Sequence, residues 1–525
     1  MRDTLSGVRG TALRAGRAGR AAALRAARRA RQRWRTASPA QRQTVRLTAS
    51  SAVLGLVVAG AAIAVAGPWD SGQRTAERAW SAAQDRGSGT KHTGEGTEAD
   101  TPSGAPEVLP AVGPTAPSGS GAGSDGAGEV PPPLPAALAD VLQPLLEDGA
   151  LGGKPLASVV DATSGRELYA AGPDKAAVPA STVKLATAAA ALSARGPEHR
   201  IETRTVRSGE DRVVLVGGGD PTLDDKGLDA LAADTARALG RSGTRKVHLG
   251  YDTSRYTGPE RHPIGTNENI APVSALMSEQ GRQDGSDHGP APRSSDPAGD
   301  AARTFADKLA DHGVKVEGEP SKEKHAPGKG AERLGTHRSA PLSSLVERML
   351  THSDNDTAEA LARQTALAEG RPASFAGGAD AVRERLGKLG LPLGGVKLAD
   401  GSGLDRADKV TPRLLSKLLV KAAEPDDAGL RSVLTGLPVA HFTGTLGERY
   451  GDQDEESGAG LVRAKTGTLT GVNTLAGTTV DADGRLLAFA FMSSGATDPQ
   501  AAEGALDRVA SALANCGCRD SPSSG

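Results

Sequence analysis

Residues 134 to 515 carry the hydrophobic periodicity of a folded region. Apolar side chains recur at helical spacing in five segments, which predicts helices over 134–145, 182–194, 342–351, 356–369 and 499–514. Short apolar or alternating runs predict strands over 157–162, 166–171, 472–480 and 485–493. The last two strands flank an Asp-Ala-Asp-Gly segment, which is typical of a hairpin turn. This order of elements predicts an α+β fold, with an antiparallel sheet covered by helices.

The stretch 201–335 interrupts this pattern. It contains short predicted strands at 213–216 and 246–250 and an Ala-rich helix at 227–239. Residues 278–299 and 318–330 are too polar and too rich in glycine to contribute to a core. We interpret 201–335 as a smaller inserted domain, so that one catalytic domain would comprise 134–200 and 336–515.

The N-terminal part of the chain predicts a membrane anchor followed by a spacer. Residues 47–69 contain no charged side chain and are long enough to cross a bilayer as a helix. The preceding 1–46 are rich in arginine, which predicts a cytoplasmic N-terminus, a single-pass anchor in the cell membrane and an extracytoplasmic catalytic domain. A cleaved signal peptide is the alternative, because Ala64-Val-Ala66 resembles a cleavage site and would give a secreted protein. Residues 70–133 are rich in Gly, Ser and Pro and predict a disordered linker.

Charge and cysteine content narrow the partners further. The net charge is −1, so only the basic arm at 1–46 favours an anionic partner. A lipid headgroup is the simpler partner beside an apolar segment, and no nucleic acid is expected. The only two cysteines, Cys516 and Cys518, are one residue apart and would form a strained bridge and a poor zinc site. We therefore expect 516–525 to be a flexible tail with no catalytic role.

The string Ser181-Thr-Val-Lys184 predicts a nucleophile beside a base. Three residues are close to one helical turn, so the hydroxyl and the amine share one face of a helix. A partly desolvated amine can lose its proton and activate the hydroxyl. Ser181 would also start its helix, where its backbone N–H could form half of an oxyanion hole. A surface helix is the common alternative for such a string, but the apolar run 185–192 favours a buried one.

The string Ser353-Asp354-Asn355 lies between two predicted helices. Ser353 would relay a proton between Lys184 and the leaving amine, and Asn355 would hold the substrate backbone. Helix capping by Asp354 or Asp356 is the structural alternative.

A third string, Lys465-Thr466-Gly467-Thr468, lies on or just before a predicted strand. The lysine and the two threonine hydroxyls could bind a terminal carboxylate through charge-assisted hydrogen bonds. Gly467 permits close approach of a substrate backbone. The N–H of Thr468 could complete the oxyanion hole with that of Ser181. An ordinary edge-strand lysine is the alternative.

In this order, the three strings resemble those of the penicillin-binding proteins. The wider context is similar to the D-alanyl-D-alanine carboxypeptidase/endopeptidase group, peptidase family S13 of low-molecular-mass class C. The resemblance rests on Pro179-Ala-Ser-Thr-Val-Lys184, Leu215-Val-Gly-Gly-Gly-Asp-Pro-Thr-Leu223, Ala271-Pro-Val-Ser-Ala-Leu276, Ser353-Asp-Asn355 with Thr357-Ala-Glu359, Asp400-Gly-Ser-Gly-Leu404, Gly444-Thr-Leu446 and Lys465-Thr-Gly467.

The resemblance implies a β-lactamase/transpeptidase-like fold and cleavage of terminal D-alanine from peptidoglycan stem peptides. Hydrolysis of peptide cross-links often accompanies that activity. β-Lactams would trap Ser181 as an acyl adduct, and the reaction needs no cofactor or metal. Thr351-His352 and His441-Phe442 depart from the expected pattern and bear on substrate preference. A β-lactamase or esterase and a catalytically inert wall-binding homologue are the alternatives.

Overall fold

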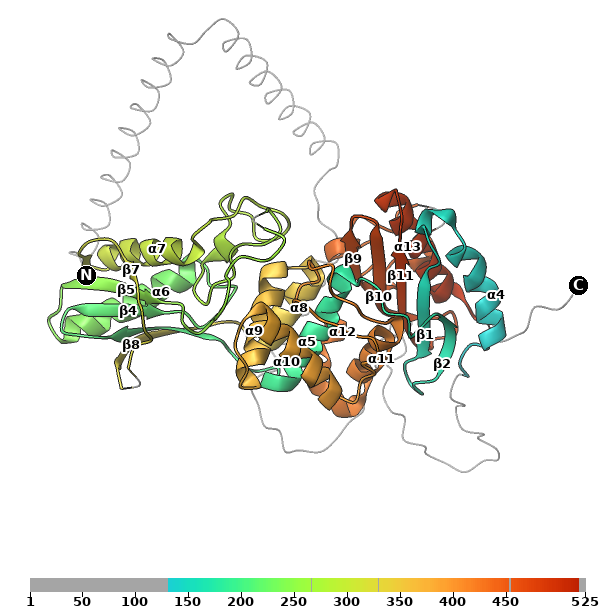
Figure 1. Ribbon diagram of the computed structural model, residues 1–525, viewed down its shortest axis with the longest axis horizontal. Coiled ribbons are helices and arrows are strands. Elements are labelled where there is room, and N and C mark those ends of the chain that lie inside the picture. The colour runs from blue at the N-terminus through green and yellow to red at the C-terminus, as the bar shows by residue number, and fades with distance from the viewer. Residues whose placement is uncertain (1–130, 266, 329, 453–454, 519–525) are drawn as a thin grey trace, which may run out of the picture. The chain divides into compact units, whose positions relative to one another are not determined.

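The computed structural model of the protein describes residues 131–265, 267–328, 330–452 and 455–518 (Figure 1). The predicted basic arm, the predicted anchor and nearly all of the predicted linker lie outside these residues. Across the described ranges, no helix combines the length and the apolar character that a membrane crossing requires.

One five-stranded antiparallel sheet joins the two ends of the described chain (Figure 1). Its strand order is β2-β1-β11-β10-β9. The bounds are β1 Leu156–Asp161, β2 Glu167–Ala171, β9 Arg463–Leu469, β10 Val472–Val480 and β11 Leu486–Ser494. β1 pairs with β11, so that Leu156 lies opposite Met492. The predicted hairpin is present as β10 and β11, and the sheet is antiparallel as expected.

Helices cover both faces of this sheet, which explains why its central strands are buried along nearly their whole length. On β11, Leu487, Phe489 and Phe491 face one core, which α4 (Pro135–Leu146) and α13 (Pro499–Asn515) complete. The alternate residues, Ala488, Ala490 and Met492, face the other core. This period of two places a leucine and two phenylalanines on one side of β11, and two alanines and a methionine on the other.

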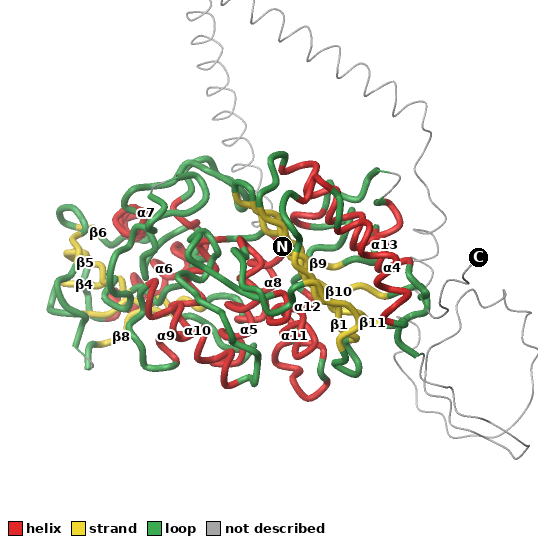
Figure 2. Tube along the Cα trace, turned by 45° about the vertical axis from the view of Figure 1, so that its right-hand side comes forward, coloured by secondary structure: helices red, strands yellow, loops and turns green. Residues whose placement is uncertain are grey.

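The second core contains most of the helices (Figures 1 and 2). They are α5 Lys184–Arg195, α8 Leu342–His352, α9 Asn355–Ala368, α10 Phe375–Lys388, α11 Pro412–Ala423 and α12 Ser432–Thr435. Helix α5 is packed against α9, α10 and α11, and its residues 184–192 are all buried. Its alanines allow this close packing on every side because they add little volume.

The elements between α5 and α8 form a second sheet with its own hydrophobic core (Figure 1). Its strands are β3 Glu202–Arg207, β4 Arg212–Val216, β5 Lys246–Asp252, β6 Lys315–Val316, β7 Ser321–Lys322 and β8 Glu332–Arg338. β4 and β5 are parallel, while β3 is antiparallel to β4 and to β8. Two helices supply most of the rest of this core, α6 Asp225–Arg241 and α7 Pro297–Asp311.

Short 3₁₀ turns complete the described elements, and one of them carries the predicted nucleophile. Their bounds are Gly149–Leu151, Ala180–Val183, Glu279–Gly281, Pro425–Leu430, Gly444–Leu446 and Glu456–Gly458. The helix predicted from residue 182 therefore begins as an α-helix only at Lys184.

The prediction of a flexible tail from residue 516 is wrong for its first three residues. Cys516 and Cys518 are joined by a disulfide. Cys516 is buried in the core beside α13, and the Cys518 carbonyl accepts a hydrogen bond from the Leu134 N–H at 2.8 Å. The end of α13 is thereby attached to the start of α4, which apolar burial and a backbone hydrogen bond stabilise together. Residues 519–525 lie outside the described part of the chain.

Candidate active site

Ser181 lies in the 3₁₀ turn that leads directly into α5. The preceding Ala180 is buried and has a positive φ of 47°, a conformation that costs energy for a residue with a Cβ. Gly403 packs on it so closely that an added Cβ would lie 2.0 Å from the Ala180 carbonyl oxygen. This tight turn leaves Ser181 half-buried at a cavity while Lys184, one turn later, is fully buried.

Lys184 contacts three oxygens with its ammonium group. They are Ser181 Oγ at 2.9 Å, Asn355 Oδ1 at 2.7 Å and the Ser402 carbonyl at 2.6 Å. Burial lowers the pKa of Lys184 to about 8, although nearby carboxylates, that of Asp400 first, act to raise it. About a tenth of the amine is therefore neutral at pH 7 and can accept the Ser181 proton.

The second string forms the turn between α8 and α9. Ser353 ends α8 in the left-handed conformation, with φ 56° and ψ 37°, and lines the same cavity as Ser181. Asp354 caps α9 by accepting a hydrogen bond from the Thr357 N–H at 2.9 Å, as the capping interpretation predicted. Within the described residues, no direct hydrogen bond joins Ser353 to Lys184. A relay through Ser353 therefore needs the substrate to complete it.

Asn355 is engaged at both ends of its amide. Its Oδ1 accepts from Lys184, and its Nδ2 donates to the Asn269 carbonyl at 3.0 Å. In the structure, this side chain orients the lysine and connects α9 to the segment that contains Asn269. Its predicted contact with the substrate backbone stays a prediction.

Lys465 is buried and does not reach the surface of the cavity. It is fully buried, it is not among the residues that line the cavity, and its Nζ donates to the Thr466 carbonyl at 2.7 Å. Burial lowers the pKa of Lys465 well below its ordinary value, and the charges of Lys184 and Arg449 lower it further. A substrate carboxylate placed nearby would favour the charged form again.

The hydroxyls of the third string point to two different partners. Thr466 Oγ1 donates to Thr445 Oγ1 at 2.8 Å, and Thr468 Oγ1 donates to Glu503 Oε1 at 2.7 Å. Of the four residues, only Thr468 lines the cavity. Gly467 lies directly against the nucleophile turn, since a Cβ there would be 2.8 Å from the Pro179 carbonyl oxygen and 3.1 Å from the Ser181 backbone nitrogen. The glycine is thus required for β9 to pass beside Ser181.

The cavity at Ser181 has a volume of about 330 Å³. It brings together Ser181, Ser353, Asn355 and Thr468, whereas Lys184, Lys465, Thr466 and Gly467 do not line it. Residues of the second sheet's connecting segment form one wall: Asn269, Arg282, His288, Gly289, Pro290 and Arg293.

This wall corrects the expectation for 278–299. Gln280 is buried and donates to Asp354 Oδ2 at 2.5 Å, and Arg293 pairs with Asp356 at 2.8 Å. The polar side chains of this segment can be buried because they form ion pairs and hydrogen bonds with carboxylates at the start of α9. A polar composition therefore does not mean an external loop.

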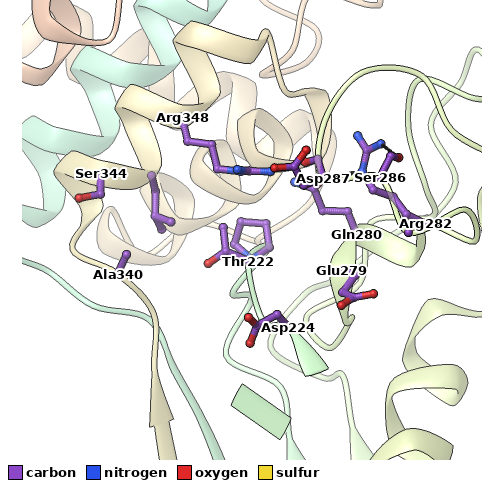
Figure 3. Close-up of a pocket in the computed structure, with 13 residues that line it drawn as sticks. Thr222, Asp224, Glu279, Gln280, Arg282, Ser286, Asp287, Ala340, Ser344 and Arg348 are labelled. Atoms are coloured by element: carbon purple, nitrogen blue, oxygen red, sulfur yellow. Dashed lines mark hydrogen bonds between the residues drawn. The ribbon is translucent and has the colours of Figure 1, made fainter. Parts of the chain in front are cut away.

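A larger cavity of about 500 Å³ lies beside the first, and Arg282 lines both (Figure 3). Figure 3 shows acidic Asp224 and Glu279 on one side of it, and Arg348 reaching toward Asp287 on another. It contains no residue of the three strings. The smaller cavity is therefore the candidate active site, because only that one places a hydroxyl beside a buried amine.

Two contributors to the site have no role in the sequence prediction. The Ser402 carbonyl holds Lys184, and Thr445 binds Thr466. Both lie in strings singled out by the resemblance, Asp400–Leu404 and Gly444–Leu446, yet neither string has a chemical pattern of its own. The backbone carbonyl in particular leaves no trace in the sequence, since any residue can supply it.

One group of buried side chains has the spacing of a cation site. One ligand atom from each of His262, Glu359 and Asp400 lies within 4.8 Å of the others. Each already has protein partners: His262 donates to Asp400, and Glu359 accepts from the Gly401 N–H and from Arg363. This donor set is satisfied as a hydrogen-bond network.

Comparisons with known proteins agree with this geometry. A sequence profile described as the D-Ala-D-Ala carboxypeptidase 3 (S13) family matches residues 138–288 and 282–515. A carboxypeptidase of Mycobacterium tuberculosis is 39% identical over 385 residues, covering 70% of this chain and 81% of that protein. A D-alanyl-D-alanine carboxypeptidase of an Actinomadura species is 30% identical over 449 residues, covering 69% and 82%.

Solved structures show the same fold. The crystal structure of penicillin binding protein 4 from Haemophilus influenzae superposes with a TM-score of 0.60 at 24% identity, covering 71% of this chain and 97% of that one. A second structure of that protein, complexed with a β-lactam, superposes with a TM-score of 0.56.

Proposed function

Because the chain belongs to the D-Ala-D-Ala carboxypeptidase 3 (S13) family, we propose that Ser181 is the nucleophile of a serine-type carboxypeptidase acting on peptidoglycan stem peptides. The observation that carries this assignment is the 2.9 Å contact between Lys184 Nζ and Ser181 Oγ at the floor of a cavity. The enzyme removes the terminal D-alanine, the activity named for its Actinomadura relative.

The reaction proceeds in two steps through an acyl-enzyme. Ser181 Oγ attacks the carbonyl carbon between the two D-alanines while neutral Lys184 takes the hydroxyl proton. The N–H groups of Ser181 and Thr468 stabilise the resulting oxyanion. The C–N bond then breaks, and Ser353 delivers the proton from Lys184 to the departing D-alanine amine. A water molecule hydrolyses the ester by the same route and regenerates the Ser181 hydroxyl.

The third string recognises the free carboxylate of the terminal D-alanine. Thr468 lines the cavity, and Lys465 and Thr466 are buried beside it on β9. The Thr468 hydroxyl, which donates to Glu503 in the structure, would turn to the carboxylate. A carboxylate that reaches this point favours the ammonium form of Lys465, which is disfavoured when the site is empty. Recognition and charging of the lysine would therefore occur together.

β-Lactams inhibit the enzyme by the first step alone. Their strained amide is attacked by Ser181, and the ring-opened acyl group stays attached because no free leaving group departs. The related Haemophilus influenzae structure contains a β-lactam, which supports the same susceptibility here. Both the substrate and the inhibitor place their carboxylate toward the third string.

Comparing two peptides tests this function. We expect a peptide ending in D-Ala-D-Ala to release D-alanine. The same peptide with a C-terminal amide should react at least about 100-fold more slowly, because the buried groups of the third string then have no carboxylate to bind. Free D-alanine is measured by a coupled D-amino-acid oxidase assay. A cross-linked peptide dimer, supplied in parallel, reports endopeptidase activity. Faster turnover of penicillin than of either peptide would instead indicate a β-lactamase.

We also propose that the catalytic region works outside the cytoplasm on a membrane anchor. Support comes from the uncharged 47–69, the basic 1–46 before it and the linker composition of 70–133. Carbonate extraction of membranes from cells producing the full chain tests this. Retention in the membrane pellet is expected, and a shortened chain in the medium would indicate a cleaved signal peptide instead.

A further inference from the structure

The carbonyl that holds Lys184 belongs to a loop, 400–405, whose shape depends on one carboxylate. Asp400 accepts hydrogen bonds from the backbone N–H groups of Ser402 at 3.0 Å, Gly403 at 2.6 Å and Asp405 at 2.7 Å. Asp400 is 1% exposed, so these bonds do not compete with bulk water. The orientation of the Ser402 carbonyl, 2.6 Å from Lys184 Nζ, therefore follows from the position of Asp400.

His262 fixes that carboxylate from outside the loop. Its Nε2 lies 3.0 Å from Asp400 Oδ2, and its Nδ1 accepts the Ile264 N–H at 3.2 Å. Because Nδ1 is an acceptor, the proton of the neutral ring is on Nε2, which donates to Asp400. The ring is buried and packs edge-on against Phe375, with centroids 5.0 Å apart. His262 is thus held in one orientation by contacts on three sides.

The hydrogen bond between His262 and Asp400 joins two segments that are far apart in the sequence. The segment that carries His262 lies between β5 and α7 of the second sheet, 138 residues before Asp400 in the chain. The hydrogen bond to Asp400 consequently connects the inserted elements to the catalytic base.

We propose that His262 is a positioning residue for catalysis, holding Lys184 against Ser181 through Asp400 and the Ser402 carbonyl. The proposal rests on the assignment of Ser181 and Lys184 as nucleophile and base. It gives the inserted elements a role in the chemistry itself, beyond the wall that they contribute to the cavity. His262 does not touch the reacting atoms, so its effect must be expressed through Lys184.

The charged groups around Lys184 determine how its pKa would respond to loss of the His262–Asp400 hydrogen bond. Acidic groups face it from the start of α9 and from the segment 400–408, and Lys465 faces it from β9: Asp354, Glu359, Asp400, Asp408 and Lys465. Burial raises the pKa of Asp408, and the adjacent charge of Asp400 raises it further, so Asp400 is the ionised member of that pair. Burial alone would raise the pKa of Asp400 too, but hydrogen bonds, that of His262 foremost, hold it low.

The test measures the acylation rate constant of full-length variants in detergent with a fluorescent penicillin, per active site titrated, from pH 6 to pH 10. We expect His262→Leu to acylate about 10- to 100-fold more slowly, because a small displacement of a base has an effect of that size. Its pH profile should also shift toward lower pH, since an ammonium that loses an acceptor is less stabilised. His262→Gln, which keeps an N–H near the position of Nε2, should stay within about threefold of wild type.

Two further variants keep the test decisive. His248→Leu replaces an exposed histidine on β5 of the second sheet. This variant should acylate at the wild-type rate and with the wild-type pH profile. If His262→Leu cannot be titrated, Asp400→Asn serves in its place and should also shift the profile to lower pH, because the Asp400 charge raises the Lys184 pKa.

Three results would overturn the proposal. The first is a wild-type rate and pH profile per titrated site in His262→Leu. The second is an unchanged profile in Asp400→Asn. The third is loss of wild-type acylation with a chelator and its recovery with Zn²⁺, which would assign His262, Glu359 and Asp400 to a cation. A wild-type protein that never acylates would instead count against the proposed function.

Discussion

Ser181→Ala is expected to abolish covalent labelling by a fluorescent penicillin and to slow D-alanine release by at least about 10³-fold. Three oxygens contact Lys184 Nζ: a side-chain amide oxygen, a backbone carbonyl and the Ser181 hydroxyl. Only the hydroxyl can lose a proton to the amine and form a bond to carbon. Labelling is read by in-gel fluorescence after denaturation, which retains covalent adducts alone, and D-alanine release by the coupled oxidase assay.

A serine in the larger cavity provides the matched control. Ser344 is exposed and lines the larger cavity, which contains no residue of the three strings. Ser344→Ala should label at the wild-type rate, and melting temperatures of both variants should match wild type because neither change opens a buried cavity. Labelling that survives in Ser181→Ala and disappears in Ser344→Ala would move the active site to the larger cavity.

The sheet and its flanking helices were predictable because their signals are local. The strands observed at Val472–Val480 and Leu486–Ser494 lie within one residue of the prediction. The turn sequence determines where the first strand ends and where the second begins. The alternation of side chains along each strand determines which residues face each core. Helix α9 is likewise within one residue, since Asp354 is a good cap.

Other elements have weaker local signals. Helices α7, α10 and α11 were not predicted, although apolar residues recur along them. Helix α10 begins Phe-Ala-Gly-Gly, and two glycines in a first turn argue against a helix by propensity. Gly378 nevertheless lies in close contact with α9, because an added Cβ would be 3.2 Å from the Ala362 side chain and the neighbouring helix would have to shift by a few tenths of an ångström. Close helix packing has overridden the local preference.

The sequence predicted those parts of the site that depend on residues close together in the chain. One helical turn brings Ser181 to Lys184, and the sequence shows that directly. The depth of Lys465, the contact of Asn355 with Lys184 and the contact of His262 with Asp400 all join residues far apart in the chain. Such contacts depend on how helices and inserted segments pack, which no spacing rule encodes.

The second large effect is expected when Lys184 loses its amine. Lys184→Met should lower the acylation rate by about 10²- to 10⁴-fold, the range typical of a lost general base. Methionine has a similar length and no charge, so it fills the buried site without an unpaired ammonium. Unchanged thermal unfolding would show that the fold is retained, which separates loss of chemistry from loss of structure.

The pH dependence of acylation tests whether the Lys184 amine is the base. Burial lowers the pKa of Lys184 from 10.5 to about 8, so the neutral, proton-accepting form accumulates as pH rises through about 8. At pH 7, about a tenth of the amine is neutral, and the wild-type acylation rate should rise nearly tenfold between pH 7 and pH 9. Lys184→Met should lose this limb together with the rate. A flat wild-type profile over that range, or a limb that persists in Lys184→Met, would mean that another group accepts the Ser181 proton.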